Sequence, residues 1–296
     1  MPTPLPAPWL SEEEFPIPKL LGGPIDGIRA VLKARRTAVK ARTAAIVQIK
    51  SFLITAPVEL RERHAHLATS ELITGLADPT PPGEDYLRSA LRKLAQRVRF
   101  LDEENDDADQ QLVSAIELVA PSLLQAKAVG PVTAAQLLVT AGENPERIKS
   151  KAAFAALYGV SPIQASSGKT NRHRLNRGGD RQANSALHQI MLVRMASDPR
   201  TKDYVARTTA QGKTKKEVMR CLKRYLGNEV FVLINRPAEV PGVEDLRPLR
   251  QARQLTLETV AQAFGVWPMK ISTIERGKRR DDEFAQKYRE FLLQAA

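Results

Sequence analysis

The chain has 296 residues, of which 43% are hydrophobic, so it can form one to three ordinary packed domains. Its formal net charge of +12 favours a polyanionic partner, and nucleic acid is the commonest of these. The aromatic content of 5% argues against a stacking platform for single-stranded bases as the main binding device, and the one cysteine, Cys221, excludes both an intrachain disulfide and a zinc site built on cysteines.

Residues 1–24 are predicted to be a disordered lead, because their seven prolines remove backbone donors and interrupt helices. The lead is not basic and then apolar, as a secretory signal would be, and no apolar run in the chain reaches the length of a membrane span. We therefore expect a cytoplasmic, nucleoid-associated protein without a membrane partner.

Residues 25–53 are predicted to form a long helix with one apolar seam. The apolar residues recur at helical spacing: Ile28, Leu32, Val39, Ile46, Ile49 and Leu53. Seven Lys and Arg lie between them, and no Asp or Glu occurs from Gly27 to Val58. Like charges along a helix cost stability, and phosphates would compensate them. We therefore expect contact with phosphates about as much as a basic face that is only solvated.

Residues 87–119 carry a heptad pattern, which predicts a coiled coil in which Asn105 can set the register. The two repeating positions hold Leu87, Leu94, Leu101, Ala108 and Ala115, and Leu91, Val98, Asn105, Leu112 and Val119. Dimerisation through this coil is the favoured interpretation, and packing on the helix of residues 25–53 within one subunit is the alternative; the two are compatible. The acidic residues from Asp102 to Asp109 are interpreted as a solvated stretch and not as a metal site.

Residues 123–157 are close to a helix-hairpin-helix, in which a Gly-rich turn offers backbone N–H groups to a DNA phosphate. Gly130 and Pro131 occupy the turn and the first helical position, and Ala128 stands where the fuller motif has its first glycine. Gly130 is therefore a candidate phosphate contact, and a plain helical hairpin is the alternative.

Residues 158–196 place a Ser-Ser-Gly before an Arg-rich loop, a Gly-Gly break and an amphipathic helix that starts at Gly179 or Asp180. From Ser166 to Gly227 there are fifteen Lys and Arg but four Asp and Glu, and a helix with a basic face is predicted over 213–234. This order sets a hydroxyl beside cations that suit phosphate. The candidate ligands of a nucleic-acid backbone are Lys169, Arg172, Arg174, Arg177, Arg181, Lys215 and Lys216.

Residues 246–278 resemble the helix-turn-helix of Cro and phage-repressor-like proteins. Thr256 is predicted to cap the first helix, Gly265 to form the turn, and the helix of residues 268–276 to enter the major groove of DNA. The side chains expected to be exposed on that helix are Met269 and three candidate DNA contacts, Lys270, Thr273 and Arg276. The departures from the resembled pattern are Leu257, Trp267 and Pro268. A three-helix domain that binds protein is the alternative.

Five motifs in a fixed order connect the core of the chain, from about Pro24 to Leu233, with a known family. They read ARRTAVKARTAAI, AVGPVTAA, FAALYGVSP, SSGK and GGDRQANSAL. As one ordered series they resemble the IS110 family of insertion-sequence transposases. Its members join an N-terminal domain similar to Holliday-junction resolvases to a coiled coil and a C-terminal transposase domain.

The resemblance implies serine chemistry on DNA. The catalytic serine of the family stands before a glycine, which matches Ser167, with Ser166 as its neighbour. The N-terminal domain of the family carries an Asp, Glu, Asp, Asp tetrad for a divalent metal, and its enzymes choose donor and target DNA with a structured guide RNA. No residue of this chain matches the tetrad, so we expect no cofactor bound by this chain, and Mg²⁺ only where a partner supplies the acidic site.

The expected fold is mainly α, with long helices forming a coiled coil. Its parts are a Pro-rich disordered lead (1–24), a basic helix and coiled coil (25–122), a helical transposase C-terminal domain with a helix-hairpin-helix and serine loop (123–236), and a small helix-turn-helix DNA-binding domain (243–296).

The favoured function is that of a truncated transposase-family protein, inactive alone, which takes part in DNA transposition or site-specific recombination by serine attack on a phosphodiester. Its expected partners are double-stranded DNA, a structured guide RNA, and a second copy or a full-length transposase. The alternative is a non-catalytic transcriptional regulator derived from a transposase. A coiled-coil scaffold is disfavoured because Lys and Arg cluster on both sides of the serine loop. Whether the chain is an enzyme stays open at this point.

Overall fold

A computed structural model describes residues 17–78, 85–164, 173–174, 176, 178–235, 242–277 and 281–294. Helices dominate this part of the chain, and its sheet has two short strands, so the mainly α class predicted from the sequence is confirmed. None of the helices in these residues is both long and apolar enough to cross a membrane.

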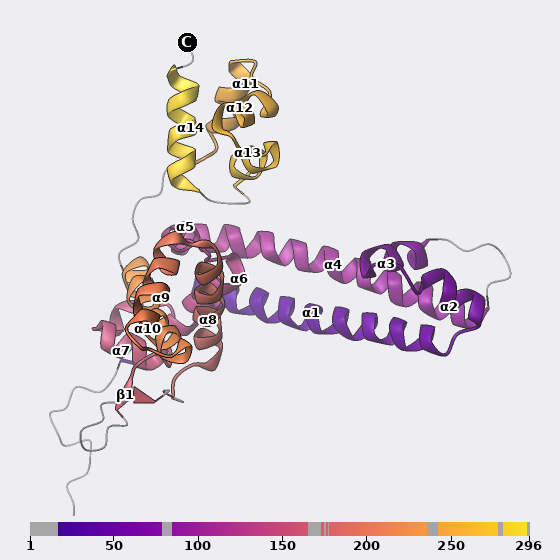
Figure 1. The fold of residues 1–296 in the computed structure, drawn as a ribbon, viewed down its shortest axis with the longest axis horizontal. Helices are drawn as coiled ribbons and strands as arrows, with labels where there is room; N and C mark the ends of the chain where they lie inside the picture. Colours follow the sequence, from indigo (N-terminus) through magenta and orange to yellow (C-terminus); the bar gives the residue numbers. More distant parts are fainter. Residues whose placement is uncertain are drawn as a thin grey trace, which may run out of the picture.

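Two long helices, α1 (Pro24–Ile54) and α4 (Tyr86–Val119), pack along each other within one chain and project from a helical body (Figure 1). The heptad positions Leu91, Val98 and Leu112 are fully buried. The intrachain alternative for the heptad pattern therefore describes this part of the fold. A coiled coil with a second copy stays a prediction.

The buried seam of α1 departs from the predicted one at Val39, and Ile46 is only partly buried. Ile28, Leu32, Ile49 and Leu53 are buried as expected, but Val39 is exposed. Two alanines replace it in the seam, Ala38 and Ala45. They are seven residues apart and so lie on the same side of the helix, whereas Val39 is rotated by about 100° from Ala38.

The acidic groups that α1 lacks come from α4. Arg35 makes a two-pronged ion pair with Asp109, at 2.6 and 2.9 Å, and Arg42 pairs with Asp102. The acidic stretch of α4 is thus partly paired with arginines, and not simply solvated. Asn105 is buried, and its Nδ2 donates to the carbonyl of Leu101 at 2.7 Å.

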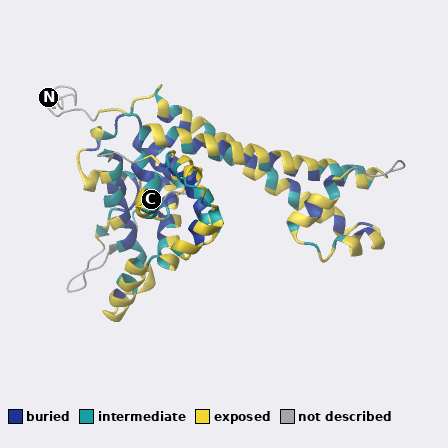
Figure 2. Ribbon diagram, turned by 90° about the horizontal axis from the view of Figure 1, so that it is seen from above, coloured by how far each residue is buried: buried dark blue, intermediate teal, exposed yellow. Residues whose placement is uncertain are grey.

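At the far end of the two long helices, α2 (Val58–His64) and α3 (Thr69–Ala77) fold back and share a small apolar core with them. Figure 2 shows buried residues along the inner seam and exposed residues along the outer faces.

The helical body is built from α5 to α10 and a short antiparallel hairpin. Its elements are α5 (Pro121–Gln125), α6 (Pro131–Ala141), the 3₁₀ helix η2 (Pro145–Arg147), α7 (Lys151–Leu157), β1 (Ile163–Gln164), β2 (His173–Arg174), α8 (Arg181–Ser197), α9 (Pro199–Ala210) and α10 (Lys215–Asn235). Phe154 and Tyr158 stack at 3.9 Å in the centre of the body, and the Tyr158 hydroxyl donates to the carbonyl of Leu137 at 2.5 Å.

The residues just before α1 belong to this body. The backbone N–H of Leu20 donates to Oδ1 of Asn144, and Nδ2 of Asn144 donates to the carbonyl of Pro18, both at 3.0 Å. The disordered lead predicted over 1–24 is therefore too long, because Pro18 and Leu20 are bonded to Asn144 of the body. Residues 1–16 lie outside the described part of the chain.

The C-terminal helices are α11 (Leu246–Ala252), α12 (Leu257–Phe264), α13 (Pro268–Glu275) and α14 (Asp282–Gln294). The Thr256 side chain caps α12, and Gly265 ends it with φ of +61°, as the sequence predicted. The apolar core of these helices also includes α14, which contributes Tyr288 and Leu292.

A buried ion pair joins the C-terminal helices. The guanidinium of Arg250 donates to both carboxylate oxygens of Glu275, at 2.7 and 3.0 Å, and the Tyr288 hydroxyl donates to the same carboxylate at 2.8 Å. Its bond to Glu275 raises the pKa of Arg250 above its ordinary value. The carboxylate of α13 is thereby tied to both α11 and α14.

Candidate nucleic-acid interface

The loop that carries Ser167 leaves and re-enters the body at one point. Gly159 precedes the loop with φ of +65°, and Gly179 follows it with φ of +82°. A Cβ on Gly179 would lie 2.6 Å from the backbone nitrogen of Gly159 and 2.5 Å from the carbonyl oxygen of Ala156. Only glycine combines that backbone angle with so close an approach, so the Gly-Gly break of the sequence closes the base of the loop.

The closed base is held by hydrogen bonds. The N–H of Asp180 donates to the carbonyl of Leu157 at 2.7 Å, and the Asp180 carboxylate caps α8 by accepting from the N–H groups of Gln182 and Ala183. Above this base, β1 and β2 pair antiparallel with Ile163 opposite Arg174. The two ends of the serine loop are therefore fixed to the body.

Asn184, on the first turns of α8, connects the loop base to α10. Its Nδ2 donates to the carbonyls of Tyr158 and Gly159, at 3.2 and 2.8 Å. Its Oδ1 accepts from Nζ of Lys223 at 2.9 Å. One amide side chain thus fixes both the turn that enters the loop and a lysine of the neighbouring helix.

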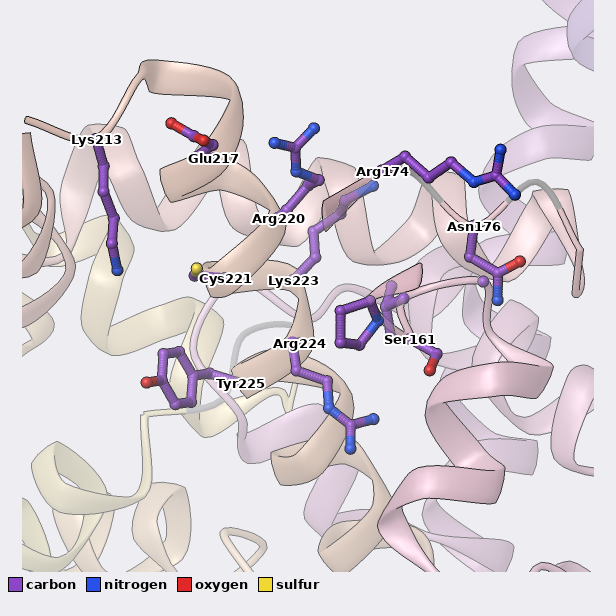
Figure 3. Close-up of a pocket in the computed structure, with 13 residues that line it drawn as sticks. Ser161, Arg174, Asn176, Lys213, Glu217, Arg220, Cys221, Lys223, Arg224 and Tyr225 are labelled. Carbon is purple, nitrogen blue, oxygen red and sulfur yellow. The ribbon is translucent and has the colours of Figure 1, made fainter. Parts of the chain in front are cut away.

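A cleft of about 470 Å³ lies between this turn and α10 (Figure 3). Its cationic lining residues are Arg174, Lys213, Arg220, Lys223 and Arg224. Among the described residues of the lining, Glu217 is the one acid, and it is engaged by Thr214 at the start of α10, whose N–H and hydroxyl donate to its carboxylate at 2.9 and 2.7 Å. The cleft therefore offers an excess of positive charge to an anion.

Lys223 is the buried cation of the cleft. Only 9% of its surface is exposed, and burial together with the nearby Arg220 lowers its pKa below the ordinary lysine value. A bound anion would offset both effects, because it favours the charged ammonium. A phosphate in the cleft would therefore stabilise the charged form of Lys223 and raise its pKa.

The structure brings one predicted backbone ligand into this cleft, Arg174. Arg181 is exposed on the first turn of α8, and Lys215 and Lys216 are exposed on the first turn of α10, outside the cleft lining. The remaining predicted residues, Ser167, Lys169, Arg172 and Arg177, lie outside the described part of the chain.

Four residues important to the cleft are absent from the site that the sequence predicts: Asn184, Arg220, Lys223 and Tyr225. The helical pattern puts Lys223 on the basic face of its helix, but the side chain is buried. Its distance of 39 residues from Asn184 gives no local sequence signal. Arg220 could be predicted as part of the basic face, because the cations from Lys213 onward recur at helical spacing.

The turn at Gly130 has the predicted form. Gly130 is the residue before α6 and Pro131 opens it, while Ala128 takes a φ of +65°, the conformation that glycine favours. The N–H of Gly130 donates to the Thr133 hydroxyl at 3.0 Å. This amide already has a partner, so a phosphate contact at Gly130 stays a prediction.

On α13 the predicted contacts are partly engaged within the domain. Nζ of Lys270 pairs with Asp281 at 2.9 Å, and the Thr273 hydroxyl donates to carbonyls of its own helix. Arg276 is exposed and bonds to Ser272. Lys270 and Thr273 are half-buried, which corrects the expectation that both would be exposed.

The carboxylates of the described residues do not fit a metal site. No three His, Cys, Asp or Glu gather there as candidate ligands. Asp102 and Asp109 are instead paired with arginines of α1.

In comparison with known proteins, residues 120–206 match the model of the transposase family IS116/IS110/IS902. This match contains α5 to α8 and both ends of the serine loop, and it ends before α10.

Two relatives come from insertion elements. The chain is 29% identical over 156 residues to an uncharacterised 43.6 kDa protein of insertion element IS110 from Streptomyces coelicolor, covering 52% of this chain and 38% of that protein. It is 24% identical over 183 residues to an uncharacterised 42 kDa protein of insertion element IS900 from Mycobacterium paratuberculosis, covering 59% and 46%. The chain thus spans less than half of each relative.

We expect the affinity of the cleft for a polyanion to fall as the pH rises toward the ordinary lysine pKa of about 10.4, because Lys223 loses its proton below that value. The protein itself is not destabilised through this group, since a lowered lysine pKa makes stability rise with pH over the same window. Oligonucleotide binding measured between about pH 7 and 10 checks this.

The matched variants are Lys223→Met and Lys215→Met, which remove the same charge from inside and outside the cleft. The first should flatten the pH dependence between neutral pH and the ordinary lysine pKa, and the second should keep it. Equal pH dependence of binding in wild type and Lys223→Met would contradict the role of the Lys223 ammonium in binding the polyanion.

Proposed function

We propose that this protein, whose residues 120–206 match the IS116/IS110/IS902 transposase family, binds DNA and contributes its serine loop to strand transfer with a partner. Ser167 is the proposed nucleophile. The partners we propose are duplex DNA, a structured guide RNA and a second or full-length transposase chain.

One observation carries this proposal: the family match encloses the loop of Ser167, and the base of that loop borders the cationic cleft. Phosphate binding needs positive charge at the place where the strand must be held. A basic surface alone would indicate nucleic acid, and the family match alone would indicate ancestry. Their coincidence at one loop supports DNA handling at this site.

The proposed chemistry is the transfer of a phosphodiester to serine. Oγ of Ser167 forms a bond to phosphorus and loses its proton, while the bond to the leaving deoxyribose oxygen breaks and that oxygen takes up a proton. The strand is then held as a phosphoserine ester, from which the reverse attack rejoins DNA. Arg174 and Arg181 can neutralise charge on the phosphate as it becomes pentacovalent. Divalent-metal chemistry is left to an acidic site on the partner.

Replacement of Ser167 by alanine should abolish strand exchange and the covalent protein–DNA adduct, because the nucleophile is removed. The reaction contains the protein, Mg²⁺, the guide RNA, donor and target DNA, and a full-length family transposase whose own serine is replaced by alanine. Denaturing electrophoresis of labelled DNA detects the adduct. Ser166→Ala is the matched control and should retain the adduct. An adduct of normal yield with Ser167→Ala would reject the proposal.

A second candidate function is that of a non-catalytic regulator that reads DNA through α13. The observation that supports it is the succession of α12, the left-handed Gly265 and α13, a short helix, a turn and a second short helix. In this arrangement the second helix would lie in the major groove with Arg276 and Met269 exposed.

For this candidate, Arg276→Ala should weaken binding to a selected duplex site by about 1–3 kcal/mol, whereas Ser167→Ala should leave binding unchanged. The sites are first selected from a random duplex pool with the full chain, and affinity is then measured by fluorescence anisotropy. Lys287→Ala, which removes an exposed cation from α14, is the control. Wild-type affinity of the Arg276→Ala protein would exclude reading of DNA through this residue.

A further inference from the structure

The cleft beside the serine loop is chemically divided. Figure 3 shows Arg174, Arg220 and Lys223 gathered at one end, and Lys213, Cys221 and Tyr225 at the other. Val160 and Pro162 also line the cleft and add apolar surface to it. The end with Arg174, Arg220 and Lys223 would be enough for a phosphate, so the aromatic ring of Tyr225 at the other end, beside Lys213 and Cys221, offers a contact to a second chemical group on the same ligand.

Tyr225 is an exposed aromatic residue that is nevertheless held in place. It is 59% exposed, and the ring of Tyr204 meets it edge to face, with centroids 5.7 Å apart and an angle of 85°. Tyr204 in turn has the guanidinium of Arg207 over its ring at 5.8 Å. This bracing fixes the Tyr225 ring while leaving it accessible, as a stacking surface requires.

The size of the cleft limits what can enter. Its volume of about 470 Å³ falls in the range of small-ligand pockets, which is about 300–1,000 Å³. A duplex is too large for this cleft, because the whole double helix is wider than its major groove, which alone measures about 12 Å. One nucleotide combines the two chemistries that the cleft offers: an anionic phosphate and a base with two apolar faces.

We propose that the cleft holds a single unpaired nucleotide of the bound DNA strand, with its phosphate on Arg220, Lys223 and Arg174 and its base stacked on Tyr225. This proposal rests on the DNA binding proposed above and adds that the strand beside the serine loop is locally unpaired. The Asn184 amide keeps Lys223 in position relative to the loop base, so the captured nucleotide has a fixed position relative to the ends of the loop.

The test removes the base and the ring separately. The full chain is titrated with a duplex that carries one unpaired nucleotide, and with the same duplex in which that nucleotide is abasic. Wild-type protein should bind the abasic duplex about 5- to 150-fold more weakly, the value of one base stacked on an aromatic ring. Tyr225→Ala should bind both duplexes equally, and Tyr225→Phe should restore the difference.

Two control variants separate the ends of the cleft from the rest of the surface. Lys223→Met should weaken binding of both duplexes by the same factor, because it acts on the phosphate. Tyr86→Ala removes a tyrosine that is 97% exposed on α4 and should keep the wild-type difference. Helical circular dichroism of Tyr225→Ala checks that the variant folds.

The outcomes are distinct. A base-dependent difference that persists in Tyr225→Ala, or that is missing in wild type, overturns the nucleotide pocket while leaving DNA binding intact. Failure of the wild-type protein to bind either duplex overturns the proposed function itself.

Discussion

The close approach of the backbones at Gly159 and Gly179 is the constraint on which the candidate site depends. These residues stand at the two ends of the serine loop, and a side chain on Gly179 would collide with the backbone around Gly159. The bond from Asp180 to Leu157 closes the same junction. Because the junction also starts α8, it sets where Asn184 and, through it, Lys223 lie. A loop with fixed ends loses less entropy when it binds, so a small junction can position a reactive segment.

Much of the helical framework could be predicted, because its signals are local. The Pro131 start of α6, the Asp180 cap of α8 and the turn at Gly265 each follow from residue types that favour one backbone geometry. The wrong predictions concern which residues of different helices contact each other. Val39 has the right chemistry for the seam of α1, yet Ala38 and Ala45 occupy it, because the approach of α4 decides which side is buried. The arginines of α1 have no acid nearby in sequence, and their acids come from α4.

The candidate site shows the same division. The Arg-rich loop, the Gly-Gly break and the basic face of α10 are visible in the sequence, because they are runs of similar residues. Asn184, Lys223 and Tyr225 give no signal alone, since each acts through a residue from another element. A lysine in a basic helix is expected to face solvent, and only the fold shows that Lys223 lies beneath its neighbours. The cleft also combines residues within the family match with α10, which lies beyond it.

The central claim is that a nucleic-acid strand lies in the cationic cleft at the base of the serine loop. The most direct measurement is the slope of log affinity against log salt concentration for wild type and for the combined variant Arg174→Gln, Arg220→Gln, Lys223→Met. Removal of one cation that neutralises a phosphate should reduce the slope by about 0.7 for a single strand or about 0.9 for a duplex, so the combined variant should have a clearly shallower slope. The same slope in both proteins would contradict the claim and place the strand elsewhere on the molecule.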